Sequence, residues 1–397
     1  MIASWALLVL GNGLPVVELA APEQKAVCAA VVVRVPELSP KGVAAARALA
    51  EAFREGSGAY GRQRWVGEGA LVGVVPKVEL TEDALLVRLA SAPGRHKVVA
   101  SLLADLLRSP MLSSEAVGRA IVRAKEGRRS FWERAVDPRA ADWAALTPRD
   151  VVSFAAWLLQ PDRVAVAIGG PFQPGEGRRA LEVRLDDWRA RVRPAEPPGL
   201  VGPGRADPPV GPPRAFRWTA RWTDLSDRGM GTLWLVASAL GAGKGGSLFR
   251  TWRIEDGFSY RQECRVEGTP SGVALRILLA KAHGLEAVPE GWRRLRTAVE
   301  AWTEQDRLRA LAVMERQGPV PHRDGALALT GFDPTLIEPF DQAALAAYWA
   351  MKTGRPLSVD AWLAEARATP LEEMKALALG LLTEAQLEGS SGSSNSG

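Results

Sequence analysis

Arg253 and Tyr260 are the two residues whose types and spacing suggest chemistry. They flank a corner in the stretch SLFRTWRIEDGFSY (247–260), where a predicted helix stops near Gly257 and a predicted strand begins. A guanidinium beside a phenolic hydroxyl is a set of donors suited to a peptide carbonyl, or to the oxyanion that forms when water attacks it. Two structural explanations remain open: an arginine is favoured at a helix C-terminus, and a tyrosine packs well on a half-buried strand.

Histidine and cysteine give little support for a metal site in this sequence. The three histidines, His96, His283 and His322, are far apart, and none has a ligand partner three or four residues away. The two cysteines, Cys28 and Cys264, fall in what we expect to be different domains, so neither a disulfide nor a thiolate metal site is predicted. We therefore expect this chain to bind no metal and no other cofactor by itself.

The glycine-rich segment GAGKGGS (241–247) is not expected to bind a nucleotide. A phosphate-binding loop needs Ser or Thr after its lysine, whereas Lys244 is followed by Gly245, and no glycine stands five residues before Gly243. We expect this segment to form a flexible turn into the helix that follows it.

The overall composition is that of a globular protein, with 47% hydrophobic and 24% charged residues. The net charge of +5 is modest for 397 residues, and basic and acidic side chains are interspersed, so nucleic-acid binding is not expected. The N-terminal apolar run lacks a positive start and leads into a Gly-Asn-Gly turn, which favours a strand and hairpin over a signal peptide. No stretch reaches the ~18 apolar residues that a membrane helix needs. We expect a cytoplasmic protein with no membrane partner.

A segment rich in proline and glycine divides the sequence almost in half. We predict an N-terminal domain at 1–192, an extended linker at 193–216, a C-terminal domain at 217–387 and a flexible tail at 388–397.

The order of predicted elements is similar in the two halves, which is typical of a duplication. The first half has strands at 14–19, 28–36, 70–80 and 83–91, a helix at 39–56 capped by Ser39, helices at 96–110 and 114–132, and a closing capped helix and strand at 147–172. In the second half, segments 214–222 and 230–241 take the place of the first two strands. They are followed by a helix at 246–257, strands at 258–268 and 273–282, helices at 288–316 and 339–353, and a final helix pair ending near 387. Strands in runs, with helices gathered between them, predict an α+β fold of two similar domains, each an antiparallel sheet flanked by helices.

Four stretches, taken in order, resemble the pitrilysin/insulinase family of zinc peptidases. They are LGNGLPVVEL (10–19), LLADLLRSPML (102–112), TPRDVVSFAAWLLQPDRVAVAIGG (147–170) and LGAGKGGSLFRTWRIEDGFSY (240–260). The similarity is to the two-domain branch that includes the mitochondrial processing peptidase and its bacterial relatives. It implies the LuxS/MPP-like metallohydrolase fold.

The resembled family carries an inverted zinc motif, His-x-x-Glu-His, on a helix of its first domain, and a further glutamate ligand downstream. The matching helix in this sequence, GVAAARALAEAF, contains no histidine, and the ligand positions map to Ala45, Ala48 and Leu49 or their neighbours. Glu126 falls close to the downstream position but has no histidines to act with. Alanine is the best helix former, so we expect the helix to persist without its metal site, and the chain to be inactive alone.

The resemblance also implies roles and partners. In this branch the second-domain pair, here Arg253 and Tyr260, lies across a chamber from the zinc and holds the substrate backbone. The implied assembly is a heterodimer in which a homologous subunit binds zinc, and this chain is the non-catalytic subunit that binds an extended peptide substrate. Two alternatives remain: a catalytically inert structural or interaction protein on the same fold, and a self-sufficient hydrolase with another mechanism. No nucleophile in a recognisable elbow supports the last.

Overall fold

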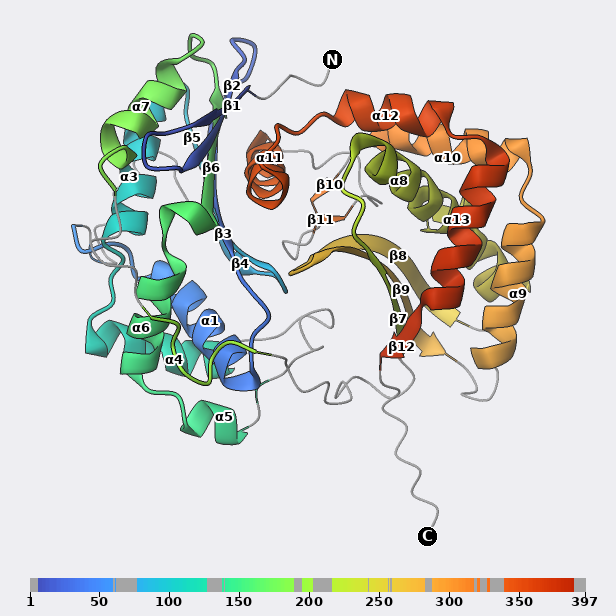
Figure 1. Ribbon diagram of the computed structural model, residues 1–397, viewed down its shortest axis with the longest axis horizontal. Helices are drawn as coiled ribbons and strands as arrows, with labels where there is room; N and C mark the ends of the chain where they lie inside the picture. Colours follow the sequence, from blue (N-terminus) through green and yellow to red (C-terminus); the bar gives the residue numbers. More distant parts are fainter. Residues whose placement is uncertain are drawn as a thin grey trace. The chain divides into compact units, whose positions relative to one another are not determined.

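The computed structural model describes residues 6–59, 61, 77–126, 138, 140–188, 195–202, 216–241, 243–255, 257, 259–282, 288–317, 320–321, 327–328 and 339–388. The chain forms two compact units (Figure 1). The first unit contains Met1–Ser130, Val136–Arg205 and Ile337–Leu357, and the second contains Phe131–Ala135, Ala206–Leu336 and Ser358–Gly397.

The first unit is built on a six-stranded sheet with the strand order β1-β2-β6-β3-β5-β4. Its strands are β1 (Ala6–Val9), β2 (Pro15–Ala20), β3 (Val27–Arg34), β4 (Lys77–Leu80), β5 (Ala84–Ser91) and β6 (Val164–Gly170). Neighbouring strands are antiparallel except for β2 and β6, which are parallel, so the prediction of an antiparallel sheet is wrong at this pair. The cause is topological: β6 lies between β2 and β3, which run in opposite directions, and must be parallel to one of them.

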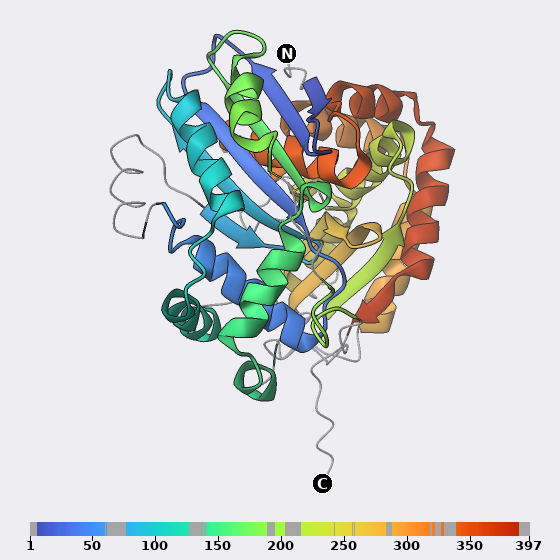
Figure 2. The ribbon, with the colours of Figure 1, turned by 60° about the vertical axis from the view of Figure 1, so that its left-hand side comes forward.

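Helices cover one face of this sheet. The helices that contact the strands are α1 (Pro40–Phe53), α3 (His96–Arg108) and α7 (Glu176–Leu185). Three more helices pack on α1: α4 (Ser114–Glu126), α5 (Ala140–Ala144) and α6 (Pro148–Leu158). The short η2 (Pro161–Arg163) precedes β6. Figure 2 shows several of these helices in front of the sheet. Two helices begin as the sequence predicts. The Ser39 hydroxyl accepts from the Gly42 amide at 3.0 Å, and Thr147 and Asp150 form a capping box.

The other face of the first sheet is covered by α11 (Pro339–Thr353), which contacts β2, β3, β5 and β6. The predicted C-terminal domain at 217–387 is therefore wrong for residues 337–357, which belong to the first unit. Two contacts fix the end of the helix, because the buried Asp83 carboxylate accepts from the Tyr348 hydroxyl at 2.6 Å and from the Lys352 ammonium at 2.8 Å. Strands β3 and β6 are apolar along almost their whole length, so both faces of the sheet require a cover.

The predicted linker at 193–216 is also corrected in part, because residues 195–202 belong to the first unit. Leu200 is fully buried, and its carbonyl accepts from the Ser39 amide at 3.0 Å. A Cβ atom on Gly42 would lie 1.9 Å from that carbonyl oxygen. The missing side chain of this glycine therefore lets the segment approach α1.

The second unit is built on a four-stranded antiparallel sheet with the order β12-β7-β9-β8. Its strands are β7 (Phe216–Trp222), β8 (Ser259–Thr269), β9 (Gly272–Ala282) and β12 (Gln386–Glu388), and a separate pair is formed by β10 (Val320–Pro321) and β11 (Leu327–Ala328). One face carries buried apolar residues such as Trp218, Ile277 and Val266. The opposite face carries buried ion pairs, Arg265 with Glu263 and Arg276 with Glu267, each at 2.5 Å.

The helices of the second unit are α8 (Asp227–Gly241), η3 (Gly243–Gly245), η4 (Phe249–Glu255), α9 (Val288–Glu300), α10 (Glu304–Gln317), α12 (Val359–Ala368) and α13 (Leu371–Glu384). Segment 230–241, expected as a strand, is the end of α8. It is buried on nearly all sides, so its apolar run has no period that distinguishes a helix from a strand. The expected helix at 288–316 is two helices, because Asp306 accepts from the Thr303 amide at 2.9 Å and starts α10 there.

Candidate functional site

Arg253 lies on η4, a seven-residue π-helical segment of the second unit. Its neighbour Trp252 is fully buried, Arg253 is half-buried, and Ile254 is 67% exposed. Gly257 follows with a φ of +58°, the left-handed conformation expected for a glycine that ends a helical segment. The buried Trp252 side chain therefore anchors one side of η4 in the core, and Arg253 lies on the other side.

Tyr260 lies on β8, which contacts η4. Its side chain is outside the part of the molecule that the structure describes. The prediction that Arg253 and Tyr260 share one concave space therefore stays a prediction. The structure adds that η4 ends at Glu255 and that β8, the strand that carries the tyrosine, begins at Ser259, with the Gly257 corner between them.

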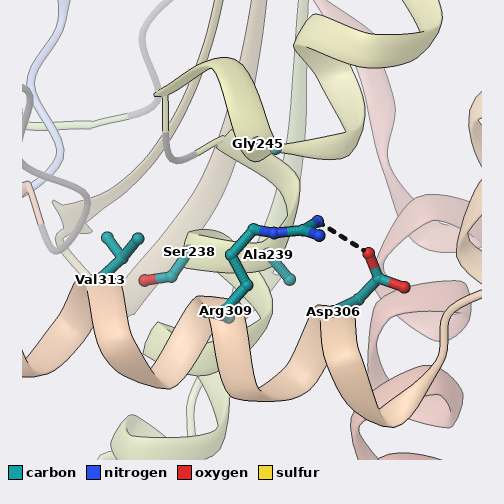
Figure 3. A pocket seen from close by; sticks show the side chains of 8 residues that line it. Ser238, Ala239, Gly245, Asp306, Arg309 and Val313 are labelled. Carbon is teal, nitrogen blue, oxygen red and sulfur yellow. Dashed lines mark hydrogen bonds and ion pairs between the residues drawn. The ribbon is translucent and has the colours of Figure 1, made fainter.

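The glycine-rich segment before η4 borders a small cavity in the second unit (Figure 3). Its volume is about 10 Å³, room for about one water molecule, and its lining includes Ser238, Gly245, Asp306 and Arg309. The Ser238 hydroxyl is buried without a hydrogen-bond partner, whereas Arg309 donates to Asp306 at 3.2 Å. A cavity of this size is too small for a nucleotide.

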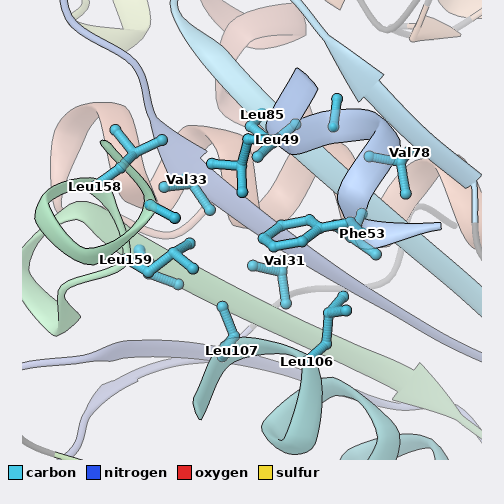
Figure 4. Packing of buried hydrophobic residues seen from close by; sticks show 14 of the residues in the cluster. Val31, Val33, Leu49, Phe53, Val78, Leu85, Leu106, Leu107, Leu158 and Leu159 are labelled. Atoms are coloured by element: carbon cyan, nitrogen blue, oxygen red, sulfur yellow. The ribbon is translucent and has the colours of Figure 1, made fainter. Parts of the chain in front are cut away.

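The positions that the resemblance assigns to zinc ligands lie in the core of the first unit. Ala45, Ala48 and Leu49 are fully buried on α1. Figure 4 shows Leu49 among the apolar side chains of the sheet and its covering helices, beside Leu85 and Val33. None of the three side chains has a nitrogen, oxygen or sulfur atom, so these positions do not fit a zinc ion.

The other candidate ligands do not supply a substitute. Glu126 is exposed at the end of α4, and His96 packs its ring on Phe172 at 5.4 Å with neither ring nitrogen hydrogen-bonded. His283 and His322 lie outside the described residues. Among the residues that the structure does describe, no group of three or more His, Cys, Asp or Glu side chains could hold a metal ion.

No protein-family model and no curated protein matches this sequence. The solved structures that match over nearly the whole chain include the following two. One is a protease from Helicobacter pylori, with a TM-score of 0.75 and 12% identity, covering 98% of this chain and 99% of that chain. The other is a peptidase M16 inactive domain from Pseudomonas fluorescens, with a TM-score of 0.69 and 13% identity, covering 96% of each chain.

The chain has an M16-like fold. The prediction of an α+β fold with two sheets flanked by helices is confirmed. The resemblance predicted from the sequence is therefore confirmed for the fold. Membership of the two-domain branch and the loss of a zinc motif stay predictions. Within the described ranges, no helix is long and apolar enough to cross a membrane.

The M16-like fold contains a charged contact between α1 and α4 that our sequence analysis missed. Glu55 follows α1 and is 1% exposed, and its carboxylate accepts from Arg119 at 3.0 Å and from Arg123. Arg123 also lies 3.6 Å from the carboxylate of Glu51. A sequence signal is present: two glutamates four residues apart lie at the end of one helix, and two arginines four residues apart lie on another.

Both cysteines are buried, neither forms a disulfide, and they lie in different units. Burial raises the pKa of the Cys28 thiol to about 12 and also raises the pKa of Cys264. Both thiols are therefore protonated and poor nucleophiles at neutral pH.

Proposed function

We propose that this chain is the non-catalytic, substrate-binding subunit of a two-subunit zinc peptidase. Arg253 and Tyr260 would bind the substrate peptide and its scissile carbonyl, and a homologous partner would supply the zinc site. This chain binds no zinc and is inactive alone. The fold similarity to a structure described as a peptidase M16 inactive domain supports the non-catalytic part of the proposal.

The observation that carries the proposal is the apolar character of α1. Ala45, Ala48 and Leu49 are fully buried in a well-filled core, where a hydrated metal ion has no ligands and no space. These observations support the proposal that this helix holds no metal ion.

The properties of Arg253 support the substrate-binding part of the proposal. The residue is half-buried on a segment whose opposite side is anchored by the fully buried Trp252. Its guanidinium offers a planar fork of donors for a backbone carbonyl, and a donor held in place before the carbonyl oxygen becomes charged stabilises the transition state most effectively. The cytoplasmic location expected from the sequence remains part of the proposal.

Reconstitution with a partner tests this function. A neighbouring reading frame of similar length with His-x-x-Glu-His, but without the arginine and tyrosine, is the partner to purify. We expect this chain alone to cleave no unstructured peptide and to contain no stoichiometric zinc by atomic absorption. Mixing the two proteins should give cleavage.

Two substitutions in this chain then decide the role of the pair. Arg253→Ala and Tyr260→Phe should each lower kcat/KM of the mixture by about 10²–10³-fold, the usual effect of removing one oxyanion donor. Arg296→Ala, at a half-buried arginine of α9, is the matched control and should leave the activity unchanged. If the double variant is as active as the parent mixture, the chain is instead an inert structural protein on the same fold.

A further inference from the structure

The segment that carries Arg253 is anchored on one side by two tryptophan indoles. The Trp252 indole N–H donates to the Gly291 carbonyl of α9 at 2.8 Å, in a buried site. The Trp302 indole N–H donates to the Ser247 hydroxyl at 2.8 Å, also in a buried site. Both bonds join residues 247–252 to the region 291–302, which is far away in sequence.

The rings add a packed contact to the first of these bonds. Trp252 lies 5.8 Å from Trp218 of β7 and 6.3 Å from Trp292 of α9, measured between ring centroids. Trp218 and Trp292 are themselves stacked at 4.6 Å. Aromatic rings at these separations attract one another in addition to the area that they bury.

An ion pair completes the attachment. Arg250 donates to Asp306 of α10 at 3.0 Å, and Asp306 also accepts from the Thr303 amide at the start of that helix. Ser247, Leu248, Thr251 and Trp252 are all at most 2% exposed. Residues 247–252 are thus held at several points, whereas Ile254 is largely exposed.

We propose that Trp252 and the Trp302–Ser247 pair are positioning residues for Arg253, an inference that rests on the proposed function of that arginine. π-Helical segments are rare and occur mostly as single turns, often at functional sites. Seven such residues need external support, and the two indole bonds provide it at both ends of residues 247–252. The arginine then binds a peptide carbonyl without a further cost of ordering its backbone.

Ile254 provides a place to measure the order of this segment in the full chain. It is 67% exposed, and the two native cysteines are 0% and 3% exposed, so a nitroxide on Ile254→Cys labels one site in the folded protein. The electron paramagnetic resonance spectrum then reports the local mobility of η4.

Three variants remove the anchors one at a time. Trp252→Phe and Trp302→Phe keep an aromatic ring and lose the N–H donor, and Ser247→Ala removes the acceptor of the second bond. Each should add a mobile component to the spectrum. Trp362→Phe is the matched control, because Trp362 is a buried tryptophan of α12 whose indole donates to Asp227 at 3.2 Å, away from η4.

The proposal is overturned if the label is as restricted in all three variants as in the parent. It is also overturned if Trp362→Phe increases the mobility of the label as much as the three variants do, at an equal loss of thermal stability.

A second measurement follows the binding of a fluorescent unstructured peptide to the full chain. Trp302→Phe should raise the dissociation constant of the peptide by about tenfold, the effect of losing one buried hydrogen bond. Trp362→Phe should leave the dissociation constant unchanged. If the parent chain binds no peptide, the proposed function fails, and the nitroxide spectra still decide whether the indoles hold the segment.

Discussion

Glu55 is a buried carboxylate that two arginines of α4 share. Burial alone would raise the pKa of this group, but the hydrogen bonds and charges of Arg119 and Arg123 outweigh it and hold the pKa below its ordinary value of 4.5. A carboxyl with a lowered pKa in the folded state binds protons more readily when unfolded. Its contribution to stability is therefore complete above about pH 4.5 and is lost as the pH falls through the folded-state pKa.

Glu55→Gln should accordingly lower the free energy of unfolding by about 1 kcal/mol at pH 7, a modest value because both arginines are partly exposed. The same variant should lose less stability than the parent as the pH falls from about 5 through the lowered pKa of Glu55. Urea unfolding at several pH values measures both effects. Glu115→Gln is the control, because Glu115 pairs with the same Arg119 but is 86% exposed, and an equal loss in this variant would contradict the role of burial.

At the scale of the element, α1 depends on a close approach that only glycine allows. Gly42→Ala would normally stabilise a helix by up to about 1 kcal/mol. At this position the added Cβ lies 1.9 Å from the Leu200 carbonyl oxygen and 2.8 Å from its carbon, both backbone atoms that cannot move aside alone. We expect a loss of about 1–3 kcal/mol in the free energy of unfolding, measured in urea.

Gly118→Ala is the matched variant for this prediction. Gly118 is also on a helix, α4, and a Cβ built there meets no atom within 4 Å. The change should therefore stabilise the protein by up to about 1 kcal/mol. Equal effects at the two sites would mean that residues 195–202 do not pack on α1.

The elements that could be predicted from sequence are those with local signals. The starts of α1 and α6 follow from Ser39 and from the Thr147 capping box, which involve residues within one turn. Segment 230–241 was assigned to the wrong state because a helix buried on nearly all sides has no polar face to reveal its period. At the candidate site, the absence of nitrogen, oxygen and sulfur atoms from the side chains of Ala45, Ala48 and Leu49 can be read from residue types alone. The indole hydrogen bonds of Trp252 to Gly291 and of Trp302 to Ser247 cannot, because they join positions that are 39 and 55 residues apart, respectively.

At the scale of the whole molecule, the chain connectivity does not follow the two sequence halves. Residues 337–357 come from the second half and complete the first unit. The sequence signal for α11 was correct, but the partner of its apolar face was not predictable, because nothing local distinguishes one sheet from another. The same limit applies to β6, which inserts between β2 and β3 only after residues 35–163 of intervening chain.

This connectivity predicts the behaviour of a chain cut between its halves. A protease site is inserted within residues 206–215 and the purified protein is cleaved there. The two pieces should then co-elute in size-exclusion chromatography under native conditions. Ala347→Asp places a charge at a fully buried position of α11 and should release the pieces. Ala364→Asp, at an exposed position of α12, should leave them together. Pieces that stay associated in the Ala347→Asp protein would show that α11 is not what holds them.

The position of α11 also has a consequence for biosynthesis. A ribosome makes the strands of the first sheet early, yet the helix that covers their second face begins only at Pro339. Until then the valines and alanines of β3 and β6 leave an exposed hydrophobic surface on the nascent chain, which can associate with other chains. We therefore expect the nascent N-terminal half to be prone to aggregation until α11 has been synthesised.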